Sequence, residues 1–510
     1  KNFAPEAKGH GVPEVMDANY YQKGVIRPVV TVVKALASAL SIGSGGSVGR
    51  EGPIIQIGSA FGSLLGQLVR MPVWQRITLV AAGAGGGIAA TFNTPIGGTL
   101  FAIELVVQEV SVRTLVPVAI ATVTATYVGR LFFGPYPSFV IPALEGNYFH
   151  VTAPALILPY LGLGILMGLA SGAYIKALYT TEAFFERRVP GGPYLRHMLG
   201  MLLVGVLMYA LFVTTGRYYT EGVGYSTIQD VLTGQLGGLW FLLLLCGLKL
   251  LATCLTLGSG ASGGIFSPSL FMGATLGGAY GVLLERLLPS LPVSPAAFAV
   301  VGMAGLVSGV TGAALAAIVM IFEMTLDYSV IVPMAATVAV SYGVRWLVSE
   351  ETIYTEKLVA RKHYVPKALR ADFHHLERAR DVMDTGVEHV PAHLPAEELG
   401  ERMRQDPAVH YILTEREGRV AGVIPAGEIA RLTLSGTQGT PVGEIAATRY
   451  VLVHEEMAFL DVLEAMQGER AGVALVVEGA RVDPGAPIVG VIDRKCVTAG
   501  LEEVVQHYLS

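Results

Sequence analysis

Residues 46–60, GSVGREGPIIQIGSA, place two charged side chains, Arg50 and Glu51, inside a stretch that is otherwise apolar and rich in glycine. Pro53 suits the first turn of a helix, where its missing N–H group costs no hydrogen bond. The free N–H groups and the positive dipole end of such a helix attract an anion. The stretch therefore predicts an anion site at a helix N-terminus, with the Glu51 carboxylate as a competitor for that site.

Two roles are open for Glu51 on physical grounds. An ionised Glu51 can fill the anion site and a protonated one can leave it, so the side chain can act as a gate that responds to pH. In the alternative interpretation, Glu51 pairs with Arg50 or caps its own helix, because acidic side chains favour a first turn.

The composition places most of the chain in a lipid bilayer. The chain has 510 residues, 52% of them hydrophobic and 15% charged, with a mean hydropathy of +0.55, and these values lie outside the range of ordinary soluble proteins. The charges are unevenly spread, since 36 lie in residues 1–360 and 39 in residues 361–510. We expect a membrane domain over 1–360, a linker over 361–380 and a soluble domain over 381–510.

Charge, cysteine content and motifs exclude several classes of protein. The net charge of −5 argues against nucleic acid as a partner, because phosphate binding needs clustered positive charge. The three cysteines show no metal-ligand or disulfide spacing, and neither a metal nor another cofactor is expected. A zinc protease needs a His-Glu-x-x-His pair, and the nearest stretch, VHEEMAF at 453–459, lacks the second histidine. An enzyme is therefore not expected.

Apolar windows predict two kinds of helix in the membrane domain. About 20 apolar residues cross a bilayer, and three windows without Lys, Arg, Asp or Glu predict transmembrane helices at 153–175, 197–216 and 328–344. Windows interrupted by glycine and proline predict half-length helices that line an interior site; they are 51–67, 77–92, 95–109, 266–284 and 311–325. Because the chain starts at Lys1 in a polar stretch, we expect that N-terminal helices are missing from it.

The membrane domain contains an internal repeat. Residues 49–66 (GREGPIIQIGSAFGSLLG) resemble residues 264–281 (GIFSPSLFMGATLGGAYG) at an offset of 215, and a second match at an offset of 219 aligns Glu104 with Glu323. Duplicated halves with broken helices are typical of transporters that bind a substrate where the repeats meet. A third helix start of the same kind, GHGVPE at 9–14, predicts that three helix N-termini converge on one anion.

Four stretches, taken in order, resemble the signature sequences of the CLC family of chloride channels and proton/chloride exchangers: GHGVP (9–13), GREGP (49–53), GGIFSP (263–268) and the tyrosine of ETIYTEKL (351–358). The resemblance implies an all-α polytopic membrane protein with the CLC inverted-repeat helical fold and chloride as its substrate. It also implies a homodimer with one pore per subunit, whose subunits meet through approximately 95–134 and 313–345. We expect a protein of the bacterial inner membrane.

The resemblance further implies the roles of individual residues. Glu51 is the gating glutamate, the Tyr354 hydroxyl donates a hydrogen bond to the anion from the intracellular side, and Arg50 is an electrostatic neighbour. The remaining ligands act mainly through backbone N–H groups. The residues expected around the anion are His10, Gly11, Arg50, Glu51, Gly52, Ile265, Phe266 and Tyr354.

Two residues depart from the family pattern. His10 replaces a serine that many relatives have, and an imidazole donates one hydrogen bond when neutral and adds a charge when protonated. Leu105 stands where exchangers commonly have a second, proton-relaying glutamate, and leucine carries no proton. The chain is therefore expected to be a passive voltage- or pH-gated chloride channel. The alternatives are a proton-coupled chloride antiporter, with Glu51 and Glu104 on the proton pathway, and a carrier for another small anion.

The soluble domain contains two units, 381–432 and 441–501, each with the pattern helix, strand, helix and two strands. They resemble a tandem pair of CBS domains, an α/β fold whose pairs can bind adenine nucleotides, and this part is expected in the cytoplasm. The usual ribose-binding pattern after the last strand is incomplete, which leaves Glu428 and Asp493 as the candidate contacts. We expect a structural role for this domain rather than nucleotide binding.

Overall fold

Long apolar helices dominate the first of the two units into which the computed structural model divides, residues 1–371, and small β-sheets dominate the second, residues 372–510. Each unit is described by itself. The structure describes residues 4–141, 157–363, 365, 370–371, 378–396, 398–399, 409–416, 419–425, 428, 439–445, 449–455, 457, 459–479, 482 and 486–498.

The first half of the helical unit runs from η1 to α6. Its elements are the 3-10 helix η1 (Pro5–Ala7), α1 (Val12–Tyr21), α2 (Val29–Gly43), α3 (Glu51–Leu68), α4 (Val73–Phe92), α5 (Pro95–Phe101), the π-helix η2 (Ala102–Val107), β1 (Glu109–Val110) and α6 (Val112–Phe133). The long helices α7 (Ile157–Arg188) and α8 (Pro193–Thr215) follow.

The second half of the helical unit repeats this order. Its elements are α9 (Tyr225–Leu232), α10 (Leu239–Gly258), α11 (Phe266–Leu287), α12 (Pro295–Thr311), α13 (Ala314–Thr325), the 3-10 helix η5 (Tyr328–Val330), α14 (Ile331–Val348) and α15 (Thr355–Ala360). β2 (Arg370–Ala371) pairs in parallel with β1.

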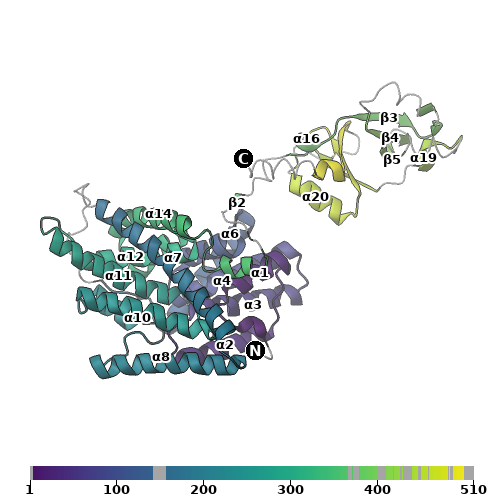
Figure 1. Ribbon diagram of the computed structural model, residues 1–510. Helices are drawn as coiled ribbons and strands as arrows, with labels where there is room; N and C mark the ends of the chain where they lie inside the picture. The colour runs from purple at the N-terminus through teal and green to yellow at the C-terminus, as the bar shows by residue number, and fades with distance from the viewer. Residues whose placement is uncertain are drawn as a thin grey trace. The chain divides into compact units, whose positions relative to one another are not determined.

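The two halves use the same helix packing. α3 packs along α4 and α11 packs along α12, and a short apolar helix follows each pair, α5 in the first half and α13 in the second. In Figure 1 the purple helices α1, α3 and α4 gather on one side of the unit and the teal helices α10, α11 and α12 on the other. The predicted duplicated helical fold is confirmed.

Glycines allow the helix backbones within each half to touch. A Cβ on Gly58 of α3 would lie 2.1 Å from the Gly83 carbonyl oxygen, and a Cβ on Gly273 of α11 would lie 2.6 Å from the Gly302 carbonyl oxygen. No side chain fits at either position. Such close packing stabilises helix pairs in a membrane, where lipid is as apolar as the helices and the hydrophobic effect provides little attraction between them.

Within the described residues, five helices are long and apolar enough to cross a bilayer. Two of them, α8 and the segment Tyr328–Val348, confirm the predicted spans at 197–216 and 328–344, and α7 covers the third predicted window from residue 157 onward. The sequence windows omit α6 and α10. Both helices contain residues that interrupt an apolar count, namely Arg113, Pro117 and Arg130 in α6 and Lys249 in α10.

The expectation of half-length helices is right for α5 and α13 and wrong for α3, α4 and α11. The former have 7 and 12 residues, whereas the latter have 18, 20 and 22. The physical reason is that several glycines of α3 and α11 lie at backbone contacts with a neighbouring helix. They mark close packing and do not end the helix.

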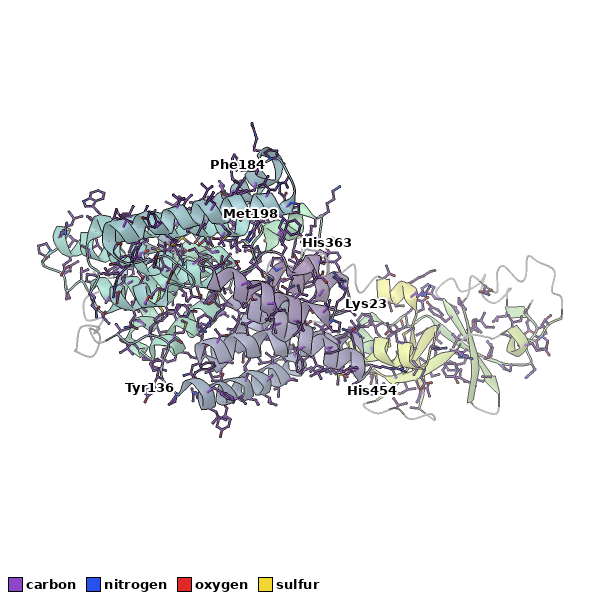
Figure 2. All side chains as sticks on the ribbon, turned by 90° about the horizontal axis from the view of Figure 1, so that it is seen from below. Lys23, Tyr136, Phe184, Met198, His363 and His454 are labelled. Carbon is purple, nitrogen blue, oxygen red and sulfur yellow. The ribbon has the colours of Figure 1, made fainter. Side chains whose placement is uncertain are left out.

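The outside of the helical unit carries exposed apolar side chains. Phe184 of α7 and Met198 of α8 lie on it (Figure 2) and are 55% and 67% exposed. On α6, Ile120 and Phe132 are 63% and 79% exposed. Apolar surface of this extent is characteristic of contact with lipid or with another protein chain, so the helical unit is a membrane protein.

The second unit contains two three-stranded sheets with one topology. In each sheet the first strand is parallel to the second, which is antiparallel to the third, and the second strand carries a register shift. The predicted tandem α/β repeat is confirmed, although the helix expected before β4 lies mostly outside the described residues. The elements are α16 (Ala379–Val382), β3 (Val387–Pro391), β4 (Tyr411–Arg416), β5 (Arg419–Pro425), α19 (Val442–Ile445), β6 (Tyr450–His454), α20 (Phe459–Gly468), β7 (Val473–Val477) and β8 (Ile488–Ile492).

Candidate functional site

The loops that precede helices α1, α3 and α11 lie side by side. Gly49 and Gly264 form an antiparallel bridge with N···O distances of 2.8 and 2.6 Å in the two directions. The Gly9 N–H donates to the Ala261 carbonyl at 3.2 Å, which joins the first loop to the third. The three helix starts are therefore joined, and their convergence on one anion stays a prediction.

These loops approach so closely that side chains would not fit at two of their glycines. A Cβ on Gly52 would lie 2.0 Å from the His10 carbonyl oxygen, and a Cβ on Gly264 would lie 2.7 Å from the Gly52 nitrogen. Gly11, the residue before α1, has a φ of 86°, which glycine adopts without strain. The backbones of these segments consequently lie directly against one another.

The Glu51 side chain is fully buried and its carboxylate reaches the N-terminus of α11. The Ser267 hydroxyl donates to Oε1 through a short hydrogen bond, and the Ser267 N–H donates to Oε2 at 3.4 Å. The Tyr225 hydroxyl donates to Oε1 at 2.7 Å. The carboxylate thus sits in the first turn of a helix from the other repeat, where the helix dipole favours negative charge.

Arg50 does not neutralise this carboxylate. Its side chain is exposed, its guanidinium lies 5.6 Å from the centroid of the Tyr225 ring, and no ion pair joins it to Glu51 in the described part of the chain. The alternative in which Glu51 pairs with Arg50 or caps its own helix is therefore wrong, because the carboxylate caps α11 instead. Arg50 is an electrostatic neighbour of the site.

The N–H groups of Gly52 in α3 and Phe266 in α11 have no backbone acceptor in the described part of the chain. Helical hydrogen bonding leaves such first-turn groups without a partner in their own helix. Ile265 and Phe266 are buried where α11 begins. The predicted backbone ligands therefore lie at the joined helix starts, and their contact with an anion stays a prediction.

His10 and Tyr354 bring the first and fourth signature stretches together. Both side chains are buried and their ring centroids are 5.7 Å apart. His10 Nε2 lies 3.4 Å from the Tyr179 hydroxyl, which donates to the Ile353 carbonyl at 2.6 Å. The Tyr179 oxygen can then only accept from Nε2–H, so a neutral His10 has an unprotonated Nδ1. This Nδ1 is buried and has no partner among the described residues.

Two buried lysines, absent from the signature stretches, hold the loops before α1 and α9. Lys34 Nζ donates to the Gly9 carbonyl at 2.7 Å, and Lys249 Nζ donates to the Gly222 carbonyl at 2.8 Å. The two lysines are 215 residues apart, the offset that relates α3 to α11. The internal repeat is therefore the sequence signal that could have revealed them.

Glu104 and Glu323, which the repeat aligns, occupy reciprocal positions. Glu104 Oε2 accepts from the Ala316 N–H of α13 at 2.8 Å, and Glu323 Oε2 accepts from the Gly97 N–H of α5 at 2.7 Å. Each carboxylate stabilises the first turn of a short helix in the other half of the unit.

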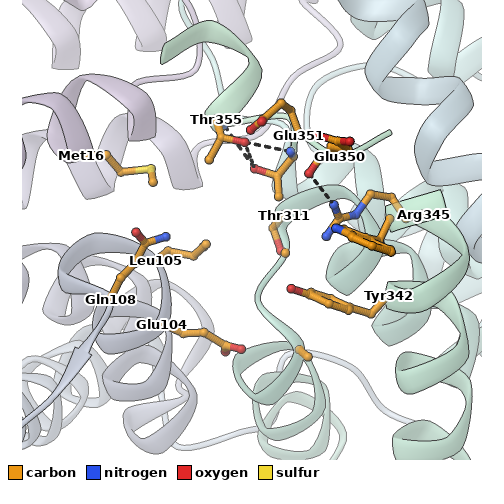
Figure 3. A pocket seen from close by; sticks show the side chains of 14 residues that line it. Met16, Glu104, Leu105, Gln108, Thr311, Tyr342, Arg345, Glu350, Glu351 and Thr355 are labelled. Carbon is orange, nitrogen blue, oxygen red and sulfur yellow. Dashed lines mark hydrogen bonds between the residues drawn. The ribbon is translucent and has the colours of Figure 1, made fainter. Parts of the chain in front are cut away.

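Glu104 also lines a cavity of about 270 Å³. Figure 3 shows Glu104 and Leu105 on one side of this cavity and Tyr342 and Arg345 on the other. Leu105 thus places an apolar side chain at the position where an exchanger would commonly have its second glutamate.

Comparisons with known proteins identify the family of the helical unit. A family model described as voltage gated chloride channel matches residues 1–345, which include the three joined loops. The chain belongs to this CLC family. A model described as CBS domain matches residues 379–435, which contain the first of the two sheets of this CLC protein.

Individual relatives support the same assignment. A protein of Ralstonia nicotianae named as a ClcB-like chloride channel protein is 36% identical over 69% of this CLC chain and 80% of its own length. The H(+)/Cl(−) exchange transporter ClcA of Vibrio parahaemolyticus is 32% identical over 70% of this chain and 75% of its own. The crystal structure of a slow cyanobacterial Cl⁻/H⁺ antiporter matches with a TM-score of 0.61 and 26% identity, over 71% of this chain and 83% of that one.

Asp493 of the second unit is engaged within its own fold. Its Oδ1 accepts from the N–H groups of Lys495 at 2.7 Å and Cys496 at 3.0 Å. Burial raises the pKa of Asp493, but the hydrogen bonds from the Tyr411 hydroxyl and from these N–H groups outweigh burial and lower it below its usual value. Residues next to Glu428 lie outside the described part of the chain, and a nucleotide contact at either carboxylate stays a prediction.

Proposed function

We propose that this chain exchanges chloride for protons across the membrane and that Glu51 is the group that alternates with the anion. The observation that supports this proposal is the contact of the Glu51 carboxylate with Ser267 in the first turn of α11, where backbone N–H groups attract anions. Relatives named as an exchange transporter and as an antiporter support the coupling. The expectation of a passive channel has support in the ClcB-like name and in the description of the family model.

In this mechanism the protonation of Glu51 decides what occupies the site. The ionised carboxylate accepts hydrogen bonds from Ser267 and Tyr225 and is attracted by the dipole of α11. A protonated carboxyl has lost the charge that this environment favours, so chloride competes successfully for the same N–H groups. The side chain that chloride displaces then carries one proton, which couples the two movements.

The proton needs a route that does not use a carboxylate at position 105. The cavity beside Leu105 is lined by polar groups, among them Glu104, Gln108 and Tyr342, and water in polar cavities forms hydrogen bonds to several such groups. We assign the intracellular proton path to water in this cavity and to Glu104. His10 contributes to the anion site as the residue that replaces serine.

The assembly follows from the resemblance and from exposed apolar surface. We propose a homodimer in the bacterial inner membrane, with residues 372–510 in the cytoplasm. Ile120 of α6 and Val332 of α14 are 63% and 57% exposed, and both lie in the ranges that the resemblance assigns to the subunit interface. The second unit has a structural role in this proposal and needs no nucleotide.

Reconstitution into liposomes with a chloride gradient tests the proposal, with chloride and proton movement recorded together. Wild-type protein should drive protons uphill. Glu51→Gln should abolish proton movement and make chloride flux independent of pH, whereas Glu285→Gln, a change at an exposed glutamate, should behave as wild type. Rapid chloride flux without proton movement in wild type would identify a passive channel, and pH-dependent flux in Glu51→Gln would exclude Glu51 as the gate.

A further inference from the structure

The loop before α9 is the second copy of the first signature stretch. GVGYST at 222–227 aligns with GHGVPE at 9–14 at an offset of 213. Gly11 and Gly224 both precede a helix with positive φ, 86° and 77°. The first copy contains the predicted anion ligands His10 and Gly11. The second copy places Tyr225 at the first position of α9.

Tyr225 is partly buried and contacts the gate. Its hydroxyl donates to Glu51 Oε1 at 2.7 Å and lies 3.0 Å from the Ser267 hydroxyl oxygen. Its ring packs edge-on against Phe139, with centroids 5.7 Å apart, and contacts Phe92 at 6.4 Å. The ring contacts would remain with phenylalanine at this position, so the specific contribution of tyrosine is the hydroxyl.

The charged groups around this contact belong to several elements. Arg50, before α3, lies over the Tyr225 ring at 5.6 Å. Lys249 of α10 interacts electrostatically with both Glu51 and Glu221, and it donates to the Gly222 carbonyl in the loop that carries Tyr225. In the described part of the chain none of these cations donates a hydrogen bond to the Glu51 carboxylate, whereas Tyr225 does.

We propose that Tyr225 is a positioning residue that holds the Glu51 carboxylate on the α11 N-terminus and so sets how often the anion path is open. This inference rests on the proposed role of Glu51 as the gate. Hydrogen bonds to charged groups are among the stronger ones in proteins. Loss of the hydroxyl weakens the closed state selectively, because an open gate no longer makes this contact.

The test is chloride flux and proton coupling in liposomes for Tyr225→Phe, with Tyr280→Phe as the matched control. The Tyr280 hydroxyl donates to the Pro159 carbonyl at 3.2 Å, so the control removes one partly buried hydroxyl contact that does not involve Glu51. At pH 7.5, Tyr225→Phe should raise chloride flux about tenfold and the control should not. The pH of half-maximal flux should rise by about one unit, since tenfold corresponds to one pH unit.

A double variant separates positioning from packing. In Glu51→Gln, adding Tyr225→Phe should change flux by less than about twofold, because the charged acceptor is already absent. Replacement of Tyr225 by 3-fluorotyrosine, which keeps the ring and makes the hydroxyl a stronger donor, should lower flux at pH 7.5. This opposite sign is not expected from a change in packing, and the measurement remains informative if Tyr225→Phe folds poorly.

The outcomes distinguish this inference from the proposed function. Flux in Tyr225→Phe at or below the wild-type value, with Glu51→Gln independent of pH, overturns the role of Tyr225 and leaves Glu51 as the gate. A wild-type pH dependence in Glu51→Gln overturns both. A tenfold rise that persists in the Glu51→Gln background also overturns the inference, since it would act through another group.

Discussion

Gly52→Ala should reduce chloride flux about 100-fold. A Cβ at this position would lie 2.0 Å from the His10 carbonyl oxygen, and real Cβ contacts essentially never fall below 3.0 Å. The loops before α1 and α3 would therefore have to separate by about 1 Å, and a displacement of this size in a functional site can cost about 100-fold in rate. The clash is with backbone, so no side-chain rotation relieves it.

The assay is chloride efflux from proteoliposomes at matched protein content. Gly205→Ala is the control, because nothing lies within 4 Å of a Cβ at that position of α8, and alanine in a helix is favoured over glycine by about 1 kcal/mol. Thermal unfolding in detergent should show a loss of about 1–3 kcal/mol for Gly52→Ala, the usual cost of overpacking. Wild-type efflux by folded Gly52→Ala would refute the proposal that chloride binds where these helix starts meet.

Three further measurements test other parts of the structure. Lys249→Met should lower stability by about 1–3 kcal/mol in thermal unfolding, because the carbonyls of Thr220 and Gly222 lose their donor; an unchanged midpoint would contradict this. His10→Ser should strengthen chloride binding measured by calorimetry at pH 7.5, because a neutral His10 presents an unprotonated Nδ1 whereas serine supplies an O–H donor; an unchanged affinity would remove His10 from the anion site. Asp493, whose pKa is lowered, stabilises the second unit above the ordinary pKa of aspartate and loses this effect as pH falls through the lowered value. Asp493→Ala should therefore speed proteolysis of that unit in the intact chain at pH 7. An unchanged rate of proteolysis would show that the Asp493 carboxylate does not stabilise the unit.

The convergence of the signature stretches could be predicted because it follows from local chemistry. Gly49, Glu51 and Pro53 define a helix start with free N–H groups, and the same pattern recurs at 264–268. A repeat that carries two such starts predicts a shared site. The spans α6 and α10 could not be predicted from apolar windows. Arg113, Pro117 and Arg130 interrupt the window of α6. Lys249 interrupts that of α10 and is tolerated only where folded loops supply carbonyl acceptors.

The sequence by itself determined that Glu51 stands at a helix N-terminus in a duplicated membrane fold, since charge, proline position and repeat are local or periodic properties. The tertiary structure decided what Glu51 contacts. Tyr225 and Ser267 lie 174 and 216 residues away along the chain, and they reach the carboxylate only because α9, α11 and the glycine-bridged loops pack together. The direction of a side chain across such distances depends on how helices pack, and no local pattern encodes that packing.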